Sequence, residues 1–165
     1  MTVVRTTRCE AETIELATRL GRGLAGGEVI CLEGPLGSGK TCFVRGLATG
    51  LGLDPSEVCS PTYVIWRRYE NHDSIGRYAL TQTPLALVHV DAFRLSGPQD
   101  LEAVGWEELL EAPDTVIAVE WPSRITEALP VQRIDVVMTH EAESARRISL
   151  DAPPEIASTW ERPHQ

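Results

Sequence analysis

The chain has 165 residues, of which 42 % are hydrophobic and 24 % are charged, and its formal net charge at pH 7 is −9. This length and composition indicate one globular domain with a substantial core, and the acidic balance argues against tight, direct binding of RNA or DNA by this chain alone. No apolar run approaches the ~18 residues of a membrane span, and none follows residues 1–5, so we expect a cytoplasmic protein with no membrane contact.

The first elements of the chain are predicted to be a short strand and a helix. Val3 to Arg5 can form the strand, and Thr7-Arg8-Cys9-Glu10 fits the S/T-x-x-E capping box that starts helices. Gly26-Gly27 would end the helix. Its apolar face is predicted from residues at helical spacing: Ile14, Ala17, Leu20 and Leu24. We expect mainly a structural role for this helix, but include Glu10 and Thr13 among the candidate cofactor-binding residues.

The next stretch contains the strongest motif of the chain. Residues 34–41, Gly-Pro-Leu-Gly-Ser-Gly-Lys-Thr, match G-x-x-x-x-G-K-[ST], the phosphate-binding P-loop. An apolar run that includes β-branched residues, Glu28 to Glu33, precedes the motif, and residues 41–48 can form a helix after it. A strand, a glycine-rich loop and a helix are the context that this motif requires.

Each fixed position of the motif suits a bound nucleotide. Glycines allow positive φ and a close approach of backbone N–H groups to phosphates, and the helix N-terminus adds a positive dipole end. Lys40, the only lysine among 15 basic residues, would reach the β- and γ-phosphates, and Thr41 would ligate a bridging Mg²⁺. The cofactor-binding candidates in this stretch are Gly37, Ser38, Gly39, Lys40, Thr41 and Cys42.

Between residues 50 and 91 the sequence predicts a loop and an antiparallel excursion from the sheet. The second half of the segment 60–69 is typical of a strand, residues 71–76 supply turn chemistry, and residues 85–91 are typical of a strand that returns to the core. The hydroxyl-bearing residues Ser60, Thr62 and Tyr63 follow the P-loop helix, where nucleotide switches place the segment that senses the γ-phosphate. A simple turn is an equally good interpretation of this loop.

The second half of the chain is predicted to complete an α/β sheet. The expected elements are short helices at 99–104 and 106–110, a buried strand at 115–121, and a hairpin of strands at 132–140 and 145–150. We therefore expect a three-layer α/β P-loop NTPase fold with a mixed sheet, parallel at its core and antiparallel at its edges. This domain would span residues 1–150, followed by a C-terminal tail at 151–165.

Two of the apolar strands end in an acid, Asp91 and Glu120. Ligands of open α/β sheets lie at the carboxyl ends of the parallel strands, so both acids are candidate Mg²⁺ ligands beside the P-loop. Together with Lys40 they form the candidate catalytic set. For His89, two residues before Asp91, a hydrogen-bonded core histidine is favoured over a general base.

Other residues leave two interpretations open. Trp121 directly follows Glu120 and can stack on a base or serve ordinary packing. Glu102, Glu107 and Glu108 form either a solvated helical face or a lid or partner contact. The four cysteines are scattered without a C-x-x-C pair, so reduced and mostly buried thiols are expected, with no zinc site.

These blocks together resemble the TsaE (YjeE) family, small bacterial P-loop ATPases needed to make threonylcarbamoyladenosine in tRNA. The resemblance covers about residues 10–150. It rests on four blocks in order: residues 34–41; Ser60-Pro61-Thr62-Tyr63; His89-Val90-Asp91-Ala92-Phe93-Arg94-Leu95; and Val119-Glu120-Trp121-Pro122. Asp100 to Gly105 also resembles the E-x-x-x-G segment of the family.

The resemblance implies that Thr41 and Glu120 ligate Mg²⁺, that Asp91 is the Walker B acid, and that residues 60–63 form a switch-like loop. Trp121 would lie against the base of ATP or ADP. Members are weak ATPases alone and work with TsaB and TsaD proteins, of which TsaD performs the carbamoyl transfer to adenosine in tRNA. Contact with tRNA would be indirect, through the complex, and the isolated chain is expected to be a monomer.

The chain departs from the family pattern in several places. Cys42 replaces the commoner Thr and Phe93 the usual Tyr, the stretch 71–84 is longer than typical, and Arg146 and Arg147 do not align securely with family nucleotide contacts. A small-molecule P-loop kinase and a nucleotide-dependent assembly module without significant hydrolysis remain the alternatives to an ATPase.

Overall fold

The computed structural model of this chain describes residues 1–61, 64–70, 86–102 and 104–160. Within these ranges the strands are β1 (Thr2–Thr7), β2 (Val29–Glu33), β3 (Trp66–Glu70), β4 (Ala86–Asp91), β5 (Thr115–Glu120), β6 (Ile134–His140) and β7 (Arg146–Asp151). The α-helices are α1 (Glu10–Arg22), α2 (Lys40–Gly50), α4 (Gln99–Glu102), α5 (Trp106–Leu110) and α6 (Pro154–Ala157). Thr62, Tyr63 and the predicted turn at 71–76 lie outside the described residues.

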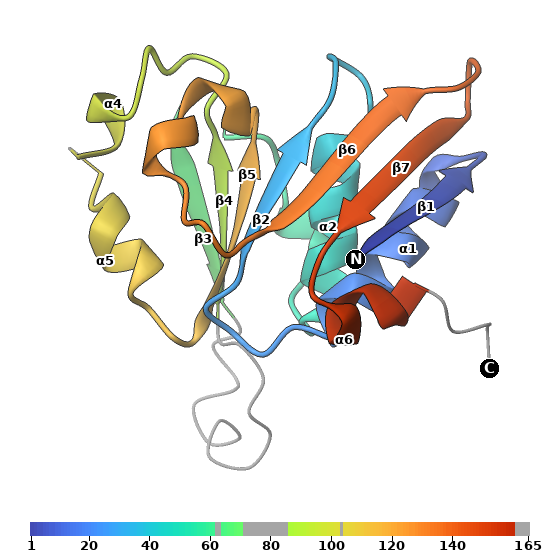
Figure 1. The fold of residues 1–165 in the computed structure, drawn as a ribbon, viewed down its shortest axis with the longest axis horizontal. Helices are drawn as coiled ribbons and strands as arrows, with labels where there is room; N and C mark the ends of the chain where they lie inside the picture. Colours follow the sequence, from blue (N-terminus) through green and yellow to red (C-terminus); the bar gives the residue numbers. More distant parts are fainter. Residues whose placement is uncertain (62–63, 71–85, 103, 161–165) are drawn as a thin grey trace.

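The strands form one mixed sheet in the order β1-β7-β6-β2-β5-β4-β3 (Figure 1). The four central strands, β6, β2, β5 and β4, run parallel, whereas β7, β1 and β3 pair antiparallel toward the two edges. β4 and β5 are buried along their whole lengths because helices cover both faces of the sheet. The predicted mixed sheet with a parallel core and antiparallel edges is confirmed.

Two hydrophobic clusters, one on each face of the sheet, make the three layers. One cluster joins α1 and α2 to the sheet, and the other joins the opposite face to α4, α5 and the 3₁₀ turns at Pro122–Arg124 and Thr126–Ala128. α1 and α2 approach closely at Gly46, where an added Cβ would lie 2.4 Å from the carbonyl oxygen of Ile14. This contact packs α2 directly against α1.

The start of α1 differs from the predicted capping box. Thr7 is the last residue of β1, where it pairs with Arg146, and its hydroxyl lies 2.8 Å from that of Thr13. The N-cap is Cys9, whose side chain makes no capping hydrogen bond. The prediction was wrong because strand pairing, which local sequence does not reveal, engages the threonine that the motif requires as a cap.

The chain after β7 packs on the same core as the rest of the domain. Ala157 and Trp160 are buried, and the ring centroid of Trp160 lies 6.3 Å from that of Phe43 in α2. Arg5 of β1 donates a hydrogen bond to the carbonyl oxygen of Trp160. The described residues of the predicted C-terminal tail, 151–160, therefore cover the α1 and α2 side of the domain.

The cysteines match the expectation of buried thiols only in part. Cys31 is buried and Cys42 half-buried, but Cys9 and Cys59 are exposed, so the expectation of mostly buried thiols holds for only half of them.

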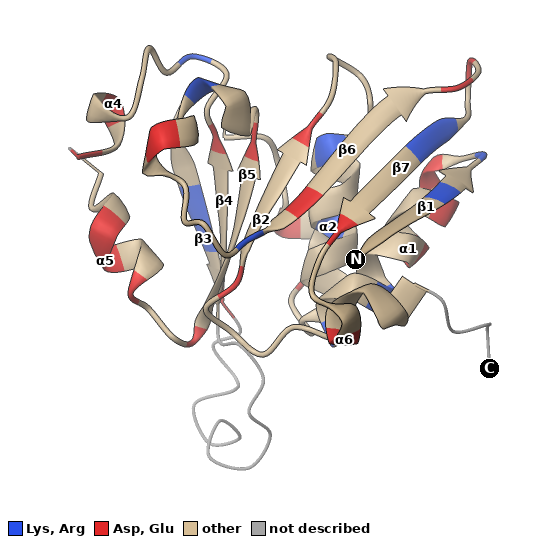
Figure 2. Cartoon of the chain, viewed as in Figure 1, with Lys and Arg blue, Asp and Glu red and all other residues tan. Residues whose placement is uncertain are grey.

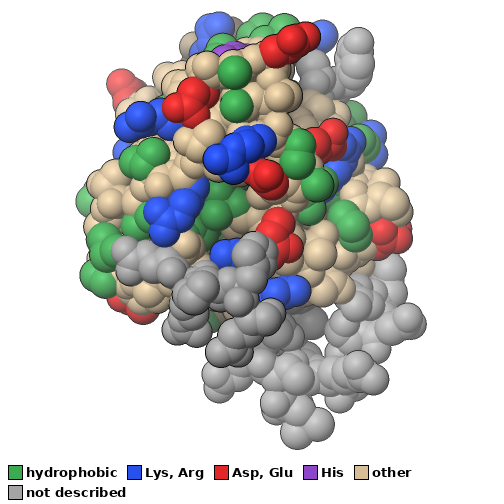
Figure 3. Space-filling view, turned by 90° about the vertical axis from the view of Figure 1, so that its right-hand side faces the viewer, with side chains coloured by type: hydrophobic (Ala, Val, Ile, Leu, Met, Phe, Trp, Pro, Cys, Tyr) green, Lys and Arg blue, Asp and Glu red, His purple; other side chains and the backbone are tan. Residues whose placement is uncertain are grey.

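Figure 3 shows that the face at the β1 edge of the sheet mixes basic, acidic and apolar side chains. None of the helices in the described ranges has the length and apolar character needed to cross a bilayer.

Candidate functional site

The loop between β2 and α2 has the backbone that its glycines permit. Gly37 and Gly39 have φ values of 77° and 100°, in the left-handed region that other residues rarely adopt. Gly39 is the N-cap of α2 and its carbonyl accepts the N–H of Phe43. The free N–H groups at the start of α2 therefore lie at the carboxyl end of β2, which is the arrangement that binds anions.

Lys40 is held directly over this loop. Its ammonium donates hydrogen bonds to the carbonyl oxygens of Gly34, at 2.8 Å, and Pro35, at 3.1 Å. The residue is only 4 % exposed. Burial lowers the pKa of Lys40 from its usual value, and the nearby carboxylates of Glu120 and Glu33 oppose this shift. The P-loop thus contains a desolvated cation with carboxylates around it.

Three strands bring carboxylates to the edge of the sheet that carries the loop. Figure 2 shows acidic residues at the ends of β2, β4 and β5, where Glu33, Asp91 and Glu120 are the last strand residues. Asp91 and Glu120 are direct partners in the parallel register of β4 and β5. The predicted pair of strand-end acids is therefore brought together beside the P-loop.

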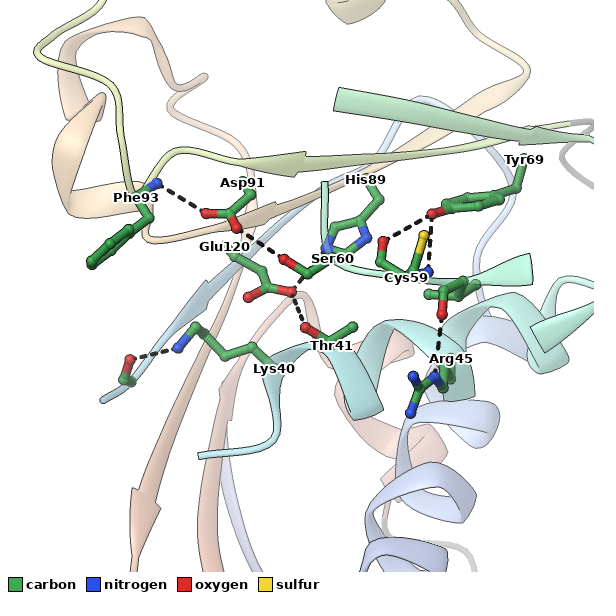
Figure 4. A network of polar contacts seen from close by, with 12 residues as sticks. Lys40, Thr41, Arg45, Cys59, Ser60, Tyr69, His89, Asp91, Phe93 and Glu120 are labelled. Atoms are coloured by element: carbon green, nitrogen blue, oxygen red, sulfur yellow. Dashed lines mark hydrogen bonds and ion pairs between the residues drawn. The ribbon is translucent and has the colours of Figure 1, made fainter. Parts of the chain in front are cut away.

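Hydrogen bonds connect these acids to the loop and to the segment after α2 (Figure 4). The Thr41 hydroxyl donates to Oε1 of Glu120 at 2.8 Å, and Nε2 of His89 lies 2.9 Å from the same oxygen. The Ser60 hydroxyl donates to Oδ2 of Asp91 at 3.0 Å, so this part of the predicted switch-like loop contacts the Asp91 side chain. The structure thus brings together five of the residues singled out from the sequence: Lys40, Thr41, Ser60, Asp91 and Glu120.

Trp121 lies on Lys40. The ammonium is 3.8 Å from the centroid of the indole, and the centroid of the Phe93 ring lies 5.1 Å from that of the indole. Trp121 has φ 60° and is the only non-glycine residue with positive φ in the described part of the chain. This contact puts the indole beside the P-loop lysine, the group expected to bind the phosphates. Stacking of Trp121 on a base, which the resemblance implies, stays a prediction.

The remaining candidates occupy different positions. The backbone carbonyl of Glu10 lies 3.7 Å from Cys42 Sγ, so Glu10 borders the first turn of α2. Burial raises the pKa of the Cys42 thiol to about 12, which keeps it protonated. Thr13 is buried, and its hydroxyl contacts Thr7 between β1 and α1. The structure brings Glu10 near the P-loop helix and directs Thr13 into the core.

Arg146 contacts the P-loop, a contact that no local pattern in the sequence predicts. It begins β7, and its Nη2 donates a hydrogen bond to the carbonyl oxygen of Gly37 at 3.2 Å. Its Nη1 donates within the turn before β7, to the carbonyl oxygens of Ala142, Glu143 and Ala145. The two partners, Gly37 and Arg146, are 109 residues apart, and the only signal in the sequence was the predicted hairpin itself.

The glutamates of the short helices α4 and α5 lie away from the P-loop. Glu102, Glu107 and Glu108 help to line a depression of about 580 Å³ over Leu101 and Trp106, on the α4 and α5 side of the sheet. None of the three glutamates forms an ion pair with another residue of the described ranges. The solvated face and the partner contact both fit this position.

A mixed α/β sheet with a P-loop after a central strand, and acids ending the neighbouring parallel strands, defines a P-loop NTPase fold. The family model described as "Threonylcarbamoyl adenosine biosynthesis protein TsaE" matches residues 7–148. The chain therefore belongs to the TsaE family, and the resemblance found in the sequence is confirmed.

Individual relatives agree with this assignment. The curated protein "tRNA threonylcarbamoyladenosine biosynthesis protein TsaE" of Treponema pallidum is 34 % identical over 143 residues, which cover 87 % of this chain and 96 % of the relative. The protein of the same name from Streptomyces coelicolor is 39 % identical over 140 residues, covering 82 % and 87 %. The crystal structure of YdiB from Bacillus subtilis has a TM-score of 0.71 at 26 % identity, covering 98 % of this chain and 93 % of that one.

Proposed function

We propose that this chain is a Mg²⁺-dependent ATP-binding protein with weak intrinsic ATPase activity, which acts with TsaB and TsaD type proteins in the threonylcarbamoyladenosine modification of tRNA. Membership of the TsaE family supports the pathway, because the curated relatives are named for it. The observation that carries the ATP part is the contact between the P-loop residue Thr41 and the strand-end acid Glu120, with Lys40 beside them.

Phosphate binding follows from the loop and its lysine. The N–H groups at the start of α2 point out of the glycine-rich loop, and the Lys40 ammonium is already desolvated above it. Phosphate oxygens are charged acceptors, and hydrogen bonds between charged groups are shorter and stronger than those to neutral carbonyls. We therefore expect Lys40 to exchange its bonds to Gly34 and Pro35 for bonds to the β- and γ-phosphates.

The donor set around Glu120 fits Mg²⁺. Mg²⁺ prefers hard oxygen ligands and is usually held by one or two carboxylates together with substrate phosphates and water. Thr41 and Glu120 would hold the ion, with Asp91 as the neighbouring acid. When bound, the ion would neutralise charge on the phosphates during hydrolysis.

Catalysis by these residues would consist of positioning and charge stabilisation. Lys40 supplies a cation in a water-poor setting, where its effect on developing charge is large. Asp91 accepts hydrogen bonds from the Ser60 hydroxyl and from the N–H of Phe93, which link the loop after α2 to the end of β4. A change in that loop is therefore coupled to the acid beside the nucleotide.

Calorimetric titration of ATP into the isolated protein tests the binding part of the proposal. In the presence of Mg²⁺ we expect saturable binding with one site per chain, and weaker binding when EDTA removes the cation, because the Thr41 and Glu120 oxygens then face unscreened phosphates. ATP binding that is unaffected by EDTA would contradict the Mg²⁺ site, and no binding under either condition would contradict the proposal as a whole.

Substitution of Trp121 should affect ATP, GTP and inorganic tripolyphosphate alike. The indole contacts Lys40 and helps to hold its ammonium beside the P-loop. Trp121→Ala is therefore expected to weaken the binding free energy of each ligand by about 0.5–2 kcal/mol, the range of a cation–π contact. Emission should change on ligand addition in the wild type and much less in Trp121→Phe, in which Trp66, Trp106 and Trp160 remain. A loss confined to ATP would instead indicate stacking of the indole on adenine.

A further inference from the structure

His89 is oriented toward the candidate site and not toward the apolar core. It lies on β4 two residues before Asp91, so both side chains leave the strand on the same face. The imidazole is completely buried, and its Nε2 lies 2.9 Å from Oε1 of Glu120. Figure 4 shows the imidazole and the Thr41 hydroxyl converging on this carboxylate. The expected buried, hydrogen-bonded histidine is confirmed, and its partner is the proposed metal ligand.

The donors around Glu120 leave one oxygen available. A carboxylate oxygen only accepts, so the Nε2 of His89 carries the proton that it donates to Oε1. The Thr41 hydroxyl donates to the same oxygen from the start of α2. No residue in the described ranges donates a hydrogen bond to Oε2. The carboxylate is thus held from two elements of the fold by one oxygen, with the other left for a ligand.

The second ring nitrogen of His89 argues against a role in packing alone. Nδ1 is buried and has no hydrogen-bond partner among the residues that the structure describes. A buried polar atom without a partner loses its hydration and gains nothing in return, so an apolar side chain would suit a purely structural position better. The contact that accounts for a histidine at this position is therefore the one that Nε2 makes with Glu120.

We propose that His89 is a positioning residue, which holds Oε1 of Glu120 so that Oε2 remains available to the divalent cation bound with the nucleotide. This inference rests on the Mg²⁺ and ATP site proposed above and deepens it. Side chains that orient a metal ligand commonly set metal affinity, and their loss typically costs ten- to a hundredfold in that affinity. The role is thus measurable as a change in the Mg²⁺ requirement.

His89→Gln and His89→Asn form a matched pair for the test. Both introduce an uncharged amide, but the amide nitrogen of Gln is three bonds from Cβ, like Nε2 of histidine, whereas that of Asn is only two. Binding of ATP is measured by calorimetry at a series of Mg²⁺ concentrations and again in EDTA, with thermal unfolding of each variant as a check on the fold.

We expect the half-saturating Mg²⁺ concentration to stay within about threefold of wild type in His89→Gln and to rise about ten- to a hundredfold in His89→Asn. The affinity for ATP in EDTA should be the same in all three proteins, which a general loss of structure would not allow. Equal Mg²⁺ dependence in the two variants would overturn the assignment. If His89→Asn does not unfold cooperatively, His89→Leu replaces it, and a wild-type Mg²⁺ requirement in that variant would overturn the assignment as well.

The same data separate this inference from the proposed function. If the ATP affinity of the wild-type protein does not depend on Mg²⁺, the result would contradict both the proposed function and the role of His89. A clear Mg²⁺ effect in the wild type that His89→Asn leaves unchanged would contradict the role of His89 alone.

Discussion

Replacing Lys40 with alanine is expected to abolish ATP turnover and leave the fold intact. The ammonium contacts loop carbonyls and the Trp121 ring, and the hydrophobic clusters of the sheet do not depend on it. Removing one preorganised donor from a catalytic site costs about 10²–10³-fold in rate, and here the donor also carries a charge. Phosphate release is the measurement, with thermal unfolding to establish that the variant is folded.

Lys40→Arg is the matched control for this experiment. It keeps the positive charge but replaces a compact ammonium with a planar guanidinium, which does not fit a position bounded by Gly34, Pro35 and the indole of Trp121. We expect Lys40→Arg to be nearly as inactive as Lys40→Ala. Turnover at the wild-type rate in a folded Lys40→Ala variant would be incompatible with a functional P-loop.

The second large effect is expected from partner proteins. The isolated chain should hydrolyse ATP slowly, and TsaB and TsaD type proteins should accelerate it, by up to ~10³-fold or more if they supply charge or order as activating partners do elsewhere. Arg146 is near the P-loop, but carbonyl oxygens of the preceding turn and of Gly37 already accept its hydrogen bonds, so it is not a free arginine finger. Phosphate release with and without the two partners is the measurement.

Three outcomes of that measurement distinguish the alternatives. Acceleration by the partners supports the proposed ATPase. Fast hydrolysis by the lone chain, or phosphate transfer to a small metabolite, would favour the kinase interpretation. ATP-dependent assembly with the partners and no release of phosphate would favour a nucleotide-dependent assembly module.

Residues with local signals were predictable from the sequence. The P-loop, the helix after it and the strand-end acids each depend on a short segment whose pattern is visible in isolation. The juxtaposition of Asp91 and Glu120 also followed, because parallel strands end at the same edge of a sheet. These features make up most of the candidate site.

Residues whose role depends on distant pairing were not predictable. Thr7 fits a helix cap but is engaged by β7, and Arg146 reaches Gly37 only because the hairpin folds back beside β2. The side-chain direction of Trp121 depends on its positive φ, which alternation along an ideal strand does not predict. Tertiary contacts override local preference at each of these positions.

Modification of tRNA in cells tests the central claim most directly. The gene for this chain, or for its Lys40→Ala variant, would replace the resident TsaE family gene of a bacterium, and threonylcarbamoyladenosine would be measured in its tRNA by mass spectrometry. The account predicts that the wild-type chain restores the modified nucleoside and that an equally abundant Lys40→Ala variant does not. Full restoration by the variant, or none by the wild-type chain, would contradict it.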